Sequence, residues 1–191
     1  MSAYGEGAYL CRKCGRVRPV LRTPAVVKGK RWEPRCPNCA GALRATGTSE
    51  KDPFICSSIY AVTKMTQEEL VMNYGTAYGV PTTALRFFNV YGPGQSLSNP
   101  YTGVAAIFMS RIKNGEAPGI FEDGLQTRDF ISVHDIVQGC MLALTRKAAN
   151  NQVFNVGTGK ATSVLELAER LVRIFGARVK PQAFNTFRKG D

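Results

Sequence analysis

From about residue 53 onward, the sequence alternates between segments with a helical pattern and short apolar segments that favour strands. Such alternation is typical of an α/β fold, in which helices connect largely parallel strands. The expected helices are 58–78, 103–113, 134–147 and 163–175, and the expected strands are 80–90, 128–133 and 153–156. At the start of the last helix, Ser163 and Glu166 have the spacing of a capping box, and Gly176 follows its end.

Residues 10–45 follow a different pattern, rich in Arg, Lys, Pro and Gly and without helical periodicity. A segment of this kind buries too little apolar surface to fold alone, so it needs a cross-link. Two cysteine pairs, Cys11 with Cys14 and Cys36 with Cys39, supply one. Four thiolates close a tetrahedral shell around zinc, with bonds of about 2.3 Å.

We therefore expect a structural zinc ion, with iron in a rubredoxin-like site as the alternative. Disulfides are disfavoured because the chain shows no secretory signal. Gly15 and Gly41 are expected to ease the turns beside the cysteine pairs. A closed shell of four cysteines leaves no open position, so we assign no catalytic role to the metal.

The chain carries a net charge of +11, and ten of its Lys and Arg residues, against three Glu, lie in residues 1–50. This excess would suit phosphate-bearing ligands, nucleic acid or an acidic partner, and the alternative is a solvated surface. A nucleic-acid reader is disfavoured because the cysteine-rich segment offers few aromatic residues for base stacking, Tyr9 and Trp32. No stretch approaches the roughly 20 apolar residues of a membrane span, so we expect a cytoplasmic protein.

Tyr60 and Lys64 are four residues apart in the first expected helix, so they share one helix face. An ammonium group beside a phenol favours the phenolate form, which makes the phenol usable for proton transfer. The spacing alone is weak evidence, because Tyr and Lys at this distance are common on ordinary helix surfaces.

A wider set of motifs accompanies this pair. The segment SSIYAVTKMTQEELVMNYGTAYGVPTTALRFFNVYGP resembles the extended short-chain dehydrogenase/reductase family of nucleotide-sugar epimerases and dehydratases, which includes UDP-glucose 4-epimerase. The resemblance continues through FEDGLQTRDFISVHDIVQGCMLAL and VFNVGTGKATSVLELAERL. Near the N-terminus, Tyr4-Gly5-Glu6-Gly7 is similar to the strand end that carries the family's YG signature.

The resemblance implies a partial Rossmann-like, doubly wound sheet, corresponding to the C-terminal half of the family fold, with an inserted four-cysteine zinc ribbon. Residues 1–9 would end a Rossmann strand, residues 10–45 would form the ribbon, and residues 53–191 would hold the catalytic helix and the sugar-nucleotide-binding part. No glycine-rich dinucleotide fingerprint precedes Tyr60. We therefore expect that the chain lacks the NAD-binding half and is inactive by itself.

The resemblance also implies residue roles. Tyr60 would be the catalytic base, Lys64 would assist it and bind the nicotinamide ribose, and Phe87 would line the nicotinamide path. Asn89, Arg128 and Arg188 would bind the sugar nucleotide through its phosphates. The alternatives are a turn cap for Asn89, an ion pair with Asp129 or Glu122 for Arg128, and plain solvated surface for Arg188.

The family's 4,6-dehydratases carry an Asp-Glu pair where this sequence has Met1 and Ser2, which favours epimerisation. The resemblance then implies a UDP- or dTDP-sugar substrate, a 4-keto intermediate formed with NAD, and a homodimer in the complete enzyme. Reduction or oxidation without epimerisation is one alternative. A non-catalytic fragment that binds a sugar nucleotide or a partner, with a structural zinc ribbon, is another.

Overall fold

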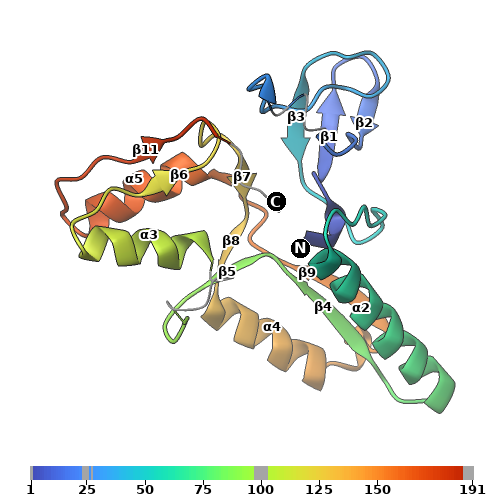
Figure 1. Ribbon diagram of the computed structural model, residues 1–191. Helices are drawn as coiled ribbons and strands as arrows, with labels where there is room; N and C mark the ends of the chain where they lie inside the picture. Colours follow the sequence, from blue (N-terminus) through green and yellow to red (C-terminus); the bar gives the residue numbers. More distant parts are fainter. Residues whose placement is uncertain (1, 23–25, 27, 97–102, 187–191) are drawn as a thin grey trace. The chain divides into compact units, whose positions relative to one another are not determined.

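The computed structural model describes residues 2–22, 26, 28–96 and 103–186, which form two compact units of helices and strands (Figure 1). The first unit runs to Arg86 and also includes Leu142–Asn155. The second unit contains Phe87–Met141 and the segment that begins at Val156. Mixed helices and parallel strand pairs confirm the expected α/β class.

A short 3-10 helix, η1 (Ser2–Tyr4), opens the first unit. The expected strand end at Tyr4 is therefore wrong. A strand needs a neighbour for its backbone groups, and within the described residues η1 has no strand beside it. The carbonyl of Ala3 instead accepts a hydrogen bond from the N–H of Ile55 at 2.8 Å, and Gly5 turns the chain with φ 61°.

Three short strands build the cysteine-rich part of the first unit: β1 (Ala8–Cys11), β2 (Gly15–Val17) and β3 (Leu43–Thr46). They form an antiparallel sheet in the order β2-β1-β3. The buried residues of its core are Cys11, Val17 and Cys36. A core of this size supports the expectation that the segment depends on a cross-link.

The long helix of the first unit is α2 (Ile59–Tyr78), as the sequence predicts. Ser58 caps its start, because the Ser58 Oγ accepts a hydrogen bond from the N–H of Ala61 at 3.2 Å. Gly79 ends it in the left-handed conformation with φ 65°. Near that end, a Cβ on Gly75 would lie 2.1 Å from Thr82 Oγ1, so a glycine is needed where the chain folds back on the helix.

The strand expected over 80–90 is divided into β4 (Thr83–Phe87) and β5 (Asn89–Tyr91). The expected strand is divided because the residues before Phe88 and those after it pair with different strands. β4 pairs with β9 (Gln152–Val156), whereas β5 pairs in parallel with β8 (Phe130–Ser132). A short helical turn, η2 (Lys147–Ala149), precedes β9.

In the second unit, α3 (Val104–Lys113) and α5 (Val164–Ile174) pack around Phe108, Ile120, Val164 and Ala168. Two strand pairs flank them: β6 (Gly119–Ile120) with β11 (Gln182–Ala183), and β7 (Thr127–Arg128) with β10 (Thr162–Ser163). The remaining helix is α4 (Val133–Thr145). The strand expected over 128–133 is interrupted at Asp129, because Arg128 belongs to β7 and Phe130 begins β8.

The start signal predicted for the last helix is confirmed at α5. The Ser163 Oγ accepts a hydrogen bond from the N–H of Glu166 at 3.0 Å. The Glu166 carboxylate does not complete the capping box, because it pairs with Arg170 at 2.6 Å. Gly176 follows the helix with φ 60°.

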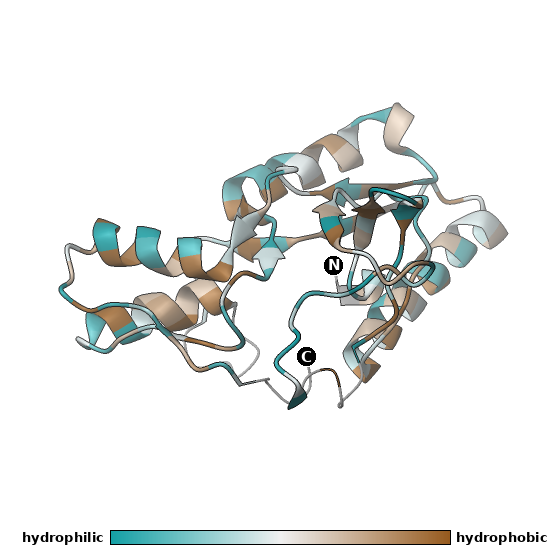
Figure 2. Ribbon diagram, turned by 90° about the horizontal axis from the view of Figure 1, so that it is seen from above, coloured by the Kyte–Doolittle hydropathy of each residue, from teal (hydrophilic) through white to brown (hydrophobic). Residues whose placement is uncertain are grey.

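Hydrophilic and hydrophobic residues alternate along the helices (Figure 2). Several large apolar side chains are exposed to solvent. On α2, Ile59 is 85% exposed, Leu70 63% and Tyr78 71%; on α4, Leu144 is 82% exposed. Among the described residues, none of the helices is both long and apolar enough to cross a bilayer.

Replacing Glu68 by Gln should lower the free energy of unfolding by about 2–4 kcal/mol, because it leaves a buried Arg86 guanidinium without its counter-charge. Chemical denaturation followed by circular dichroism measures the change. Glu166→Gln, which breaks the exposed pair with Arg170, is the control and should cost no more than about 0.5 kcal/mol. Equal losses in the two variants would contradict the prediction.

Candidate active site and metal centre

The first candidate site is the exposed face at the start of α2. Tyr60 and Lys64 lie one helical turn apart, and the Lys64 Nζ is 5.5 Å from the centre of the Tyr60 ring. The Tyr60 side chain is 59% exposed. Lys64 also donates a hydrogen bond to Gln67 Oε1 at 3.1 Å, which leaves further donors on its ammonium group. A cation beside an accessible phenol is the arrangement that the spacing predicts.

Farther along the same helix, Glu68 holds a buried arginine of strand β4. The Glu68 carboxylate accepts two hydrogen bonds from the Arg86 guanidinium, at 2.8 and 2.6 Å. Arg86 also donates to the Tyr4 hydroxyl and to the carbonyl of Glu50. The Tyr4 hydroxyl in turn donates to Asn155 Oδ1 at 2.8 Å. Burial raises the pKa of Tyr4, although its hydrogen bond to Arg86 opposes the shift.

This network was not among the residues singled out from the sequence. One signal was available, because Arg86 interrupts an apolar, strand-forming segment between Leu85 and Phe87. A charge in such a position is buried only when it is paired. Its partners come from segments far apart in the sequence, so no local pattern could identify them.

The residues expected to bind phosphate lie in the second unit. Asn89 is in β5, and its N–H donates to the carbonyl of Asp129 at 2.9 Å. Arg128 is exposed in β7, and its Nη1 donates to the carbonyl of Thr127 at 2.9 Å. Within the described residues no carboxylate pairs with Arg128, so the alternative of an ion pair is not realised.

Asp129 has its own hydrogen bonds. Its carboxylate accepts from the N–H of Thr158 at 2.9 Å, from the Thr158 hydroxyl at 2.7 Å and from the N–H of Gly159 at 2.8 Å. Asp129 therefore fixes the turn that follows β9 and leaves the neighbouring Arg128 guanidinium exposed.

The structure brings together some of the expected site residues and not all. Tyr60 and Lys64 lie together in the first unit, whereas Phe87, Asn89 and Arg128 belong to the second. Phe87 is 38% exposed. Arg188 lies outside the described residues.

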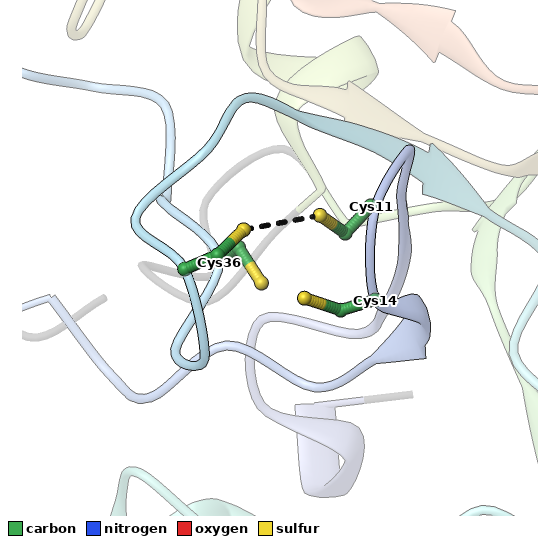
Figure 3. A group of neighbouring side chains, drawn as sticks. Cys11, Cys14 and Cys36 are labelled. Atoms are coloured by element: carbon green, nitrogen blue, oxygen red, sulfur yellow. Dashed lines mark hydrogen bonds between the residues drawn. The ribbon is translucent and has the colours of Figure 1, made fainter.

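The second candidate site is the cluster of Cys11, Cys14, Cys36 and Cys39. Their sulfur atoms all lie within 4.8 Å of one another, and the three cysteines labelled in Figure 3 point toward a common centre. Cys11 and Cys36 are buried, and the sulfurs of Cys11 and Cys39 are 3.5 Å apart. All six cysteines of the chain are described, and all are free thiols. The spacing suits four sulfur ligands around one ion.

The backbone of the second cysteine pair is shaped to this cluster. The N–H of Cys36 donates to the carbonyl of Gly41 at 3.0 Å, and the N–H of Ala40 donates to the carbonyl of Cys36 at 2.8 Å. The left-handed residue is Ala40, with φ 55°. Gly41 is instead needed for space, because a Cβ there would lie 3.2 Å from the Cys39 sulfur. At the first pair, Gly15 is left-handed with φ 73°, as expected.

The thiols of the first pair differ in acidity. Hydrogen bonds from the backbone N–H groups of Cys14 and Lys13 lower the pKa of Cys11 to about 7. The neighbouring sulfurs, Cys39 first, and burial raise the pKa of Cys14 to about 12. Four thiolates at this distance repel one another, and a bound cation removes that repulsion.

Comparison with known proteins identifies the fold family. The model of the NAD dependent epimerase/dehydratase family matches residues 38–157, which is more than half of the chain. The chain belongs to this family. Within the family, its sequence is 34% identical over 190 residues to dTDP-L-rhamnose 4-epimerase of Burkholderia thailandensis, a match that spans 100% of this chain and 51% of that protein.

Other epimerases show the same relationship. A putative UDP-glucose 4-epimerase of Methanocaldococcus jannaschii is 38% identical to this chain. The match covers 68% of this chain and 41% of the Methanocaldococcus protein. The structure of UDP-glucose 4-epimerase from Thermotoga maritima with UDP-glucose has a TM-score of 0.71 and 36% identity, and covers 78% of this chain and 47% of that one.

UDP-glucuronic acid 4-epimerase from Bacillus cereus, in complex with UDP-glucuronic acid and NAD, matches with a TM-score of 0.66 and 30% identity. That match covers 75% of this chain and 45% of that one. The chain thus spans about half the length of the curated relatives it matches.

Proposed function

We propose that the chain supplies the catalytic helix and part of the sugar-nucleotide site of an NAD-dependent NDP-sugar 4-epimerase. The observation that carries the proposal is the Tyr60 phenol on the exposed face of α2, with the Lys64 ammonium beside it. The names of its relatives, several of which are 4-epimerases of UDP- or dTDP-sugars, support the same reaction.

In this proposal, Tyr60 acts as a phenolate, which the charge of Lys64 stabilises, and it becomes a neutral phenol when it takes the proton from a sugar hydroxyl. NAD, when bound, takes up hydride from the sugar and returns it. Tyr60 and Lys64 suit the nicotinamide end of that cofactor because Tyr60 presents an exposed hydroxyl and Lys64 a partly exposed ammonium group, and Phe87 offers a partly exposed ring. Tyr60 would give its proton back when the sugar hydroxyl is formed again.

The phosphates of the substrate are assigned to Asn89, Arg128 and Arg188. The exposed guanidinium of Arg128 is available for a forked pair of hydrogen bonds, because within the described chain no carboxylate holds it.

The homodimer and the cytoplasmic location expected from the sequence remain predictions for the whole protein.

We also propose that Cys11, Cys14, Cys36 and Cys39 bind one structural zinc ion, with iron as the alternative. Sulfur atoms within 4.8 Å of one another, on two turns of a ribbon with a very small core, support this site. The metal would close the ribbon and would leave no position for a substrate.

Tyr60→Phe should lower turnover of a UDP- or dTDP-sugar by about 10²–10⁴-fold in a protein that also carries the NAD-binding half, because proton transfer is lost. Tyr74→Phe is the matched control, since Tyr74 lies on the same helix and is also 59% exposed. A coupled assay of the epimerised sugar measures both variants. Full activity in Tyr60→Phe would remove this residue from the mechanism.

Calorimetry on the 191-residue chain tests the sugar-nucleotide site independently of catalysis. Binding of UDP-glucose without binding of NAD is expected if the chain holds only the sugar-nucleotide part. Failure to bind either ligand would count against the assignment of Asn89 and Arg128 to the substrate phosphates.

Metal analysis should find one zinc ion per chain, and Cys39→Ser should lose it because the sulfur shell becomes incomplete. Cys140→Ser is the control, because Cys140 is an exposed thiol on α4 and is not a member of the cluster. Iron would be recognised by its visible absorption. A metal-free protein with a fully ordered ribbon would disprove the metal site.

A further inference from the structure

Residues 47–58 connect the ribbon to the catalytic helix without forming a helix or a strand. This connection would be free to move if nothing held it. In the structure its side chains and backbone are bound at both ends, on one side to the ribbon and on the other to α2 and β9.

On the ribbon side, two arginines hold Asp52. Arg16 in β2 pairs with the Asp52 carboxylate and donates to the carbonyl of Gly47 at 3.0 Å. The Arg18 guanidinium is 3.4 Å from the same carboxylate, and the Asp52 side chain is 12% exposed. Arg16 follows Cys14 by two residues, so the turn that carries the first cysteine pair also fixes the arginine.

On the other side, Glu50 is bound to two elements of the first unit. Its carboxylate accepts a hydrogen bond from the N–H of Asn155 in β9 at 2.8 Å. Its carbonyl accepts from Arg86 at 3.0 Å, and Arg86 forms the buried pair with Glu68 of α2. Glu68 is four residues, about one turn, beyond Lys64. The Arg16–Asp52 pair, the short backbone segment between Glu50 and Asp52, and the Glu50–Arg86–Glu68 contacts therefore connect the ribbon to the helix that carries Tyr60.

The ribbon end of this set depends on the ribbon being folded. Among the described residues, its buried cluster consists of Cys11, Val17 and Cys36, with the partly buried Tyr9, Cys14 and Leu43 packed against it. Small domains of this kind are usually unfolded without their metal, so the binding energy of the metal becomes folding energy. Without the metal, Arg16 and Arg18 would no longer be held in place to bind Asp52.

We propose that the metal-loaded ribbon is a clamp that positions the start of α2, with Asp52 and Glu50 as its positioning residues. The inference rests on the proposed four-cysteine metal site and adds a role for it in placing Tyr60 and Lys64. Because coupling between two sites is reciprocal, a change that loosens α2 must also weaken metal binding.

Hydrogen–deuterium exchange of the full chain, with zinc and after chelation, tests the clamp. In the unaltered protein, chelation should raise exchange in β1–β3 and, by about tenfold, in the peptide that covers residues 58–70. In Asp52→Asn the ribbon should still bind zinc and open on chelation, but exchange of residues 58–70 should no longer respond. A general loss of stability would instead raise exchange throughout, with and without zinc.

Asp123→Asn is the matched control, because the Asp123 carboxylate also accepts a backbone N–H, that of Leu125, but lies in the second unit and forms no pair with an arginine in the described structure. In Asp123→Asn, exchange of residues 58–70 should rise on chelation as it does in the unaltered chain. Glu68→Gln, which breaks the pair with Arg86, should weaken zinc binding by at most the factor by which zinc protects α2 from exchange, and unchanged zinc affinity would contradict the coupling.

A ribbon that opens on chelation while residues 58–70 of the unaltered chain exchange as before would overturn the clamp and leave the metal site intact. A response that persists in Asp52→Asn would also overturn it. If the chain binds no zinc at all, the metal site itself fails, and the clamp fails with it.

Discussion

The first unit depends on one guanidinium group. Arg86 is 7% exposed, and a charge in such a place is tolerated only when it is paired and its donors are satisfied. Glu68 supplies the counter-charge, while the Tyr4 hydroxyl and the Glu50 carbonyl accept further hydrogen bonds. The Phe54 ring lies 4.4 Å from the guanidinium carbon. Three segments that are distant in sequence, η1, the connection 47–58 and α2, are thus arranged around a single side chain of β4.

This arrangement matters because the apolar cores are small. Within the described residues, the buried cluster of the ribbon has three members and the cluster between α3 and α5 has four, while α2 keeps several large apolar side chains exposed. Directional contacts then decide where α2 starts: the Ser58 cap, the Ile55–Ala3 hydrogen bond and the Arg86–Glu68 pair. The geometry of the proposed catalytic pair therefore rests on polar contacts more than on hydrophobic burial.

Local signals in the sequence predicted the helices well, because caps and periodicity are local; Ser58, Ser163 and Gly176 mark helix boundaries in the structure as expected. The proximity of Lys64 to Tyr60 and of the four cysteines was also predictable from spacing. The breaks at Phe88 and Asp129 were not, because they reflect a change of strand partner and a carboxylate that binds a distant turn. The Arg86 network escaped prediction for the same reason. The close approach of Gly41 to the Cys39 sulfur, two residues away, depends on the geometry of the turn, which the residue pattern does not define.

The register of the ribbon sheet has a consequence for how such proteins diversify. Ala8 at the start of β1 lies directly opposite Thr46 at the end of β3. The chain thus departs for the ribbon and returns from it at neighbouring points, as in insertions that a host fold accepts without rearrangement. Excising residues 9–45 would leave the flanking segments at their present separation. The excision would also remove Arg16 and Arg18. The shortened protein would then keep the course of its backbone but lose the two arginines that pair with Asp52.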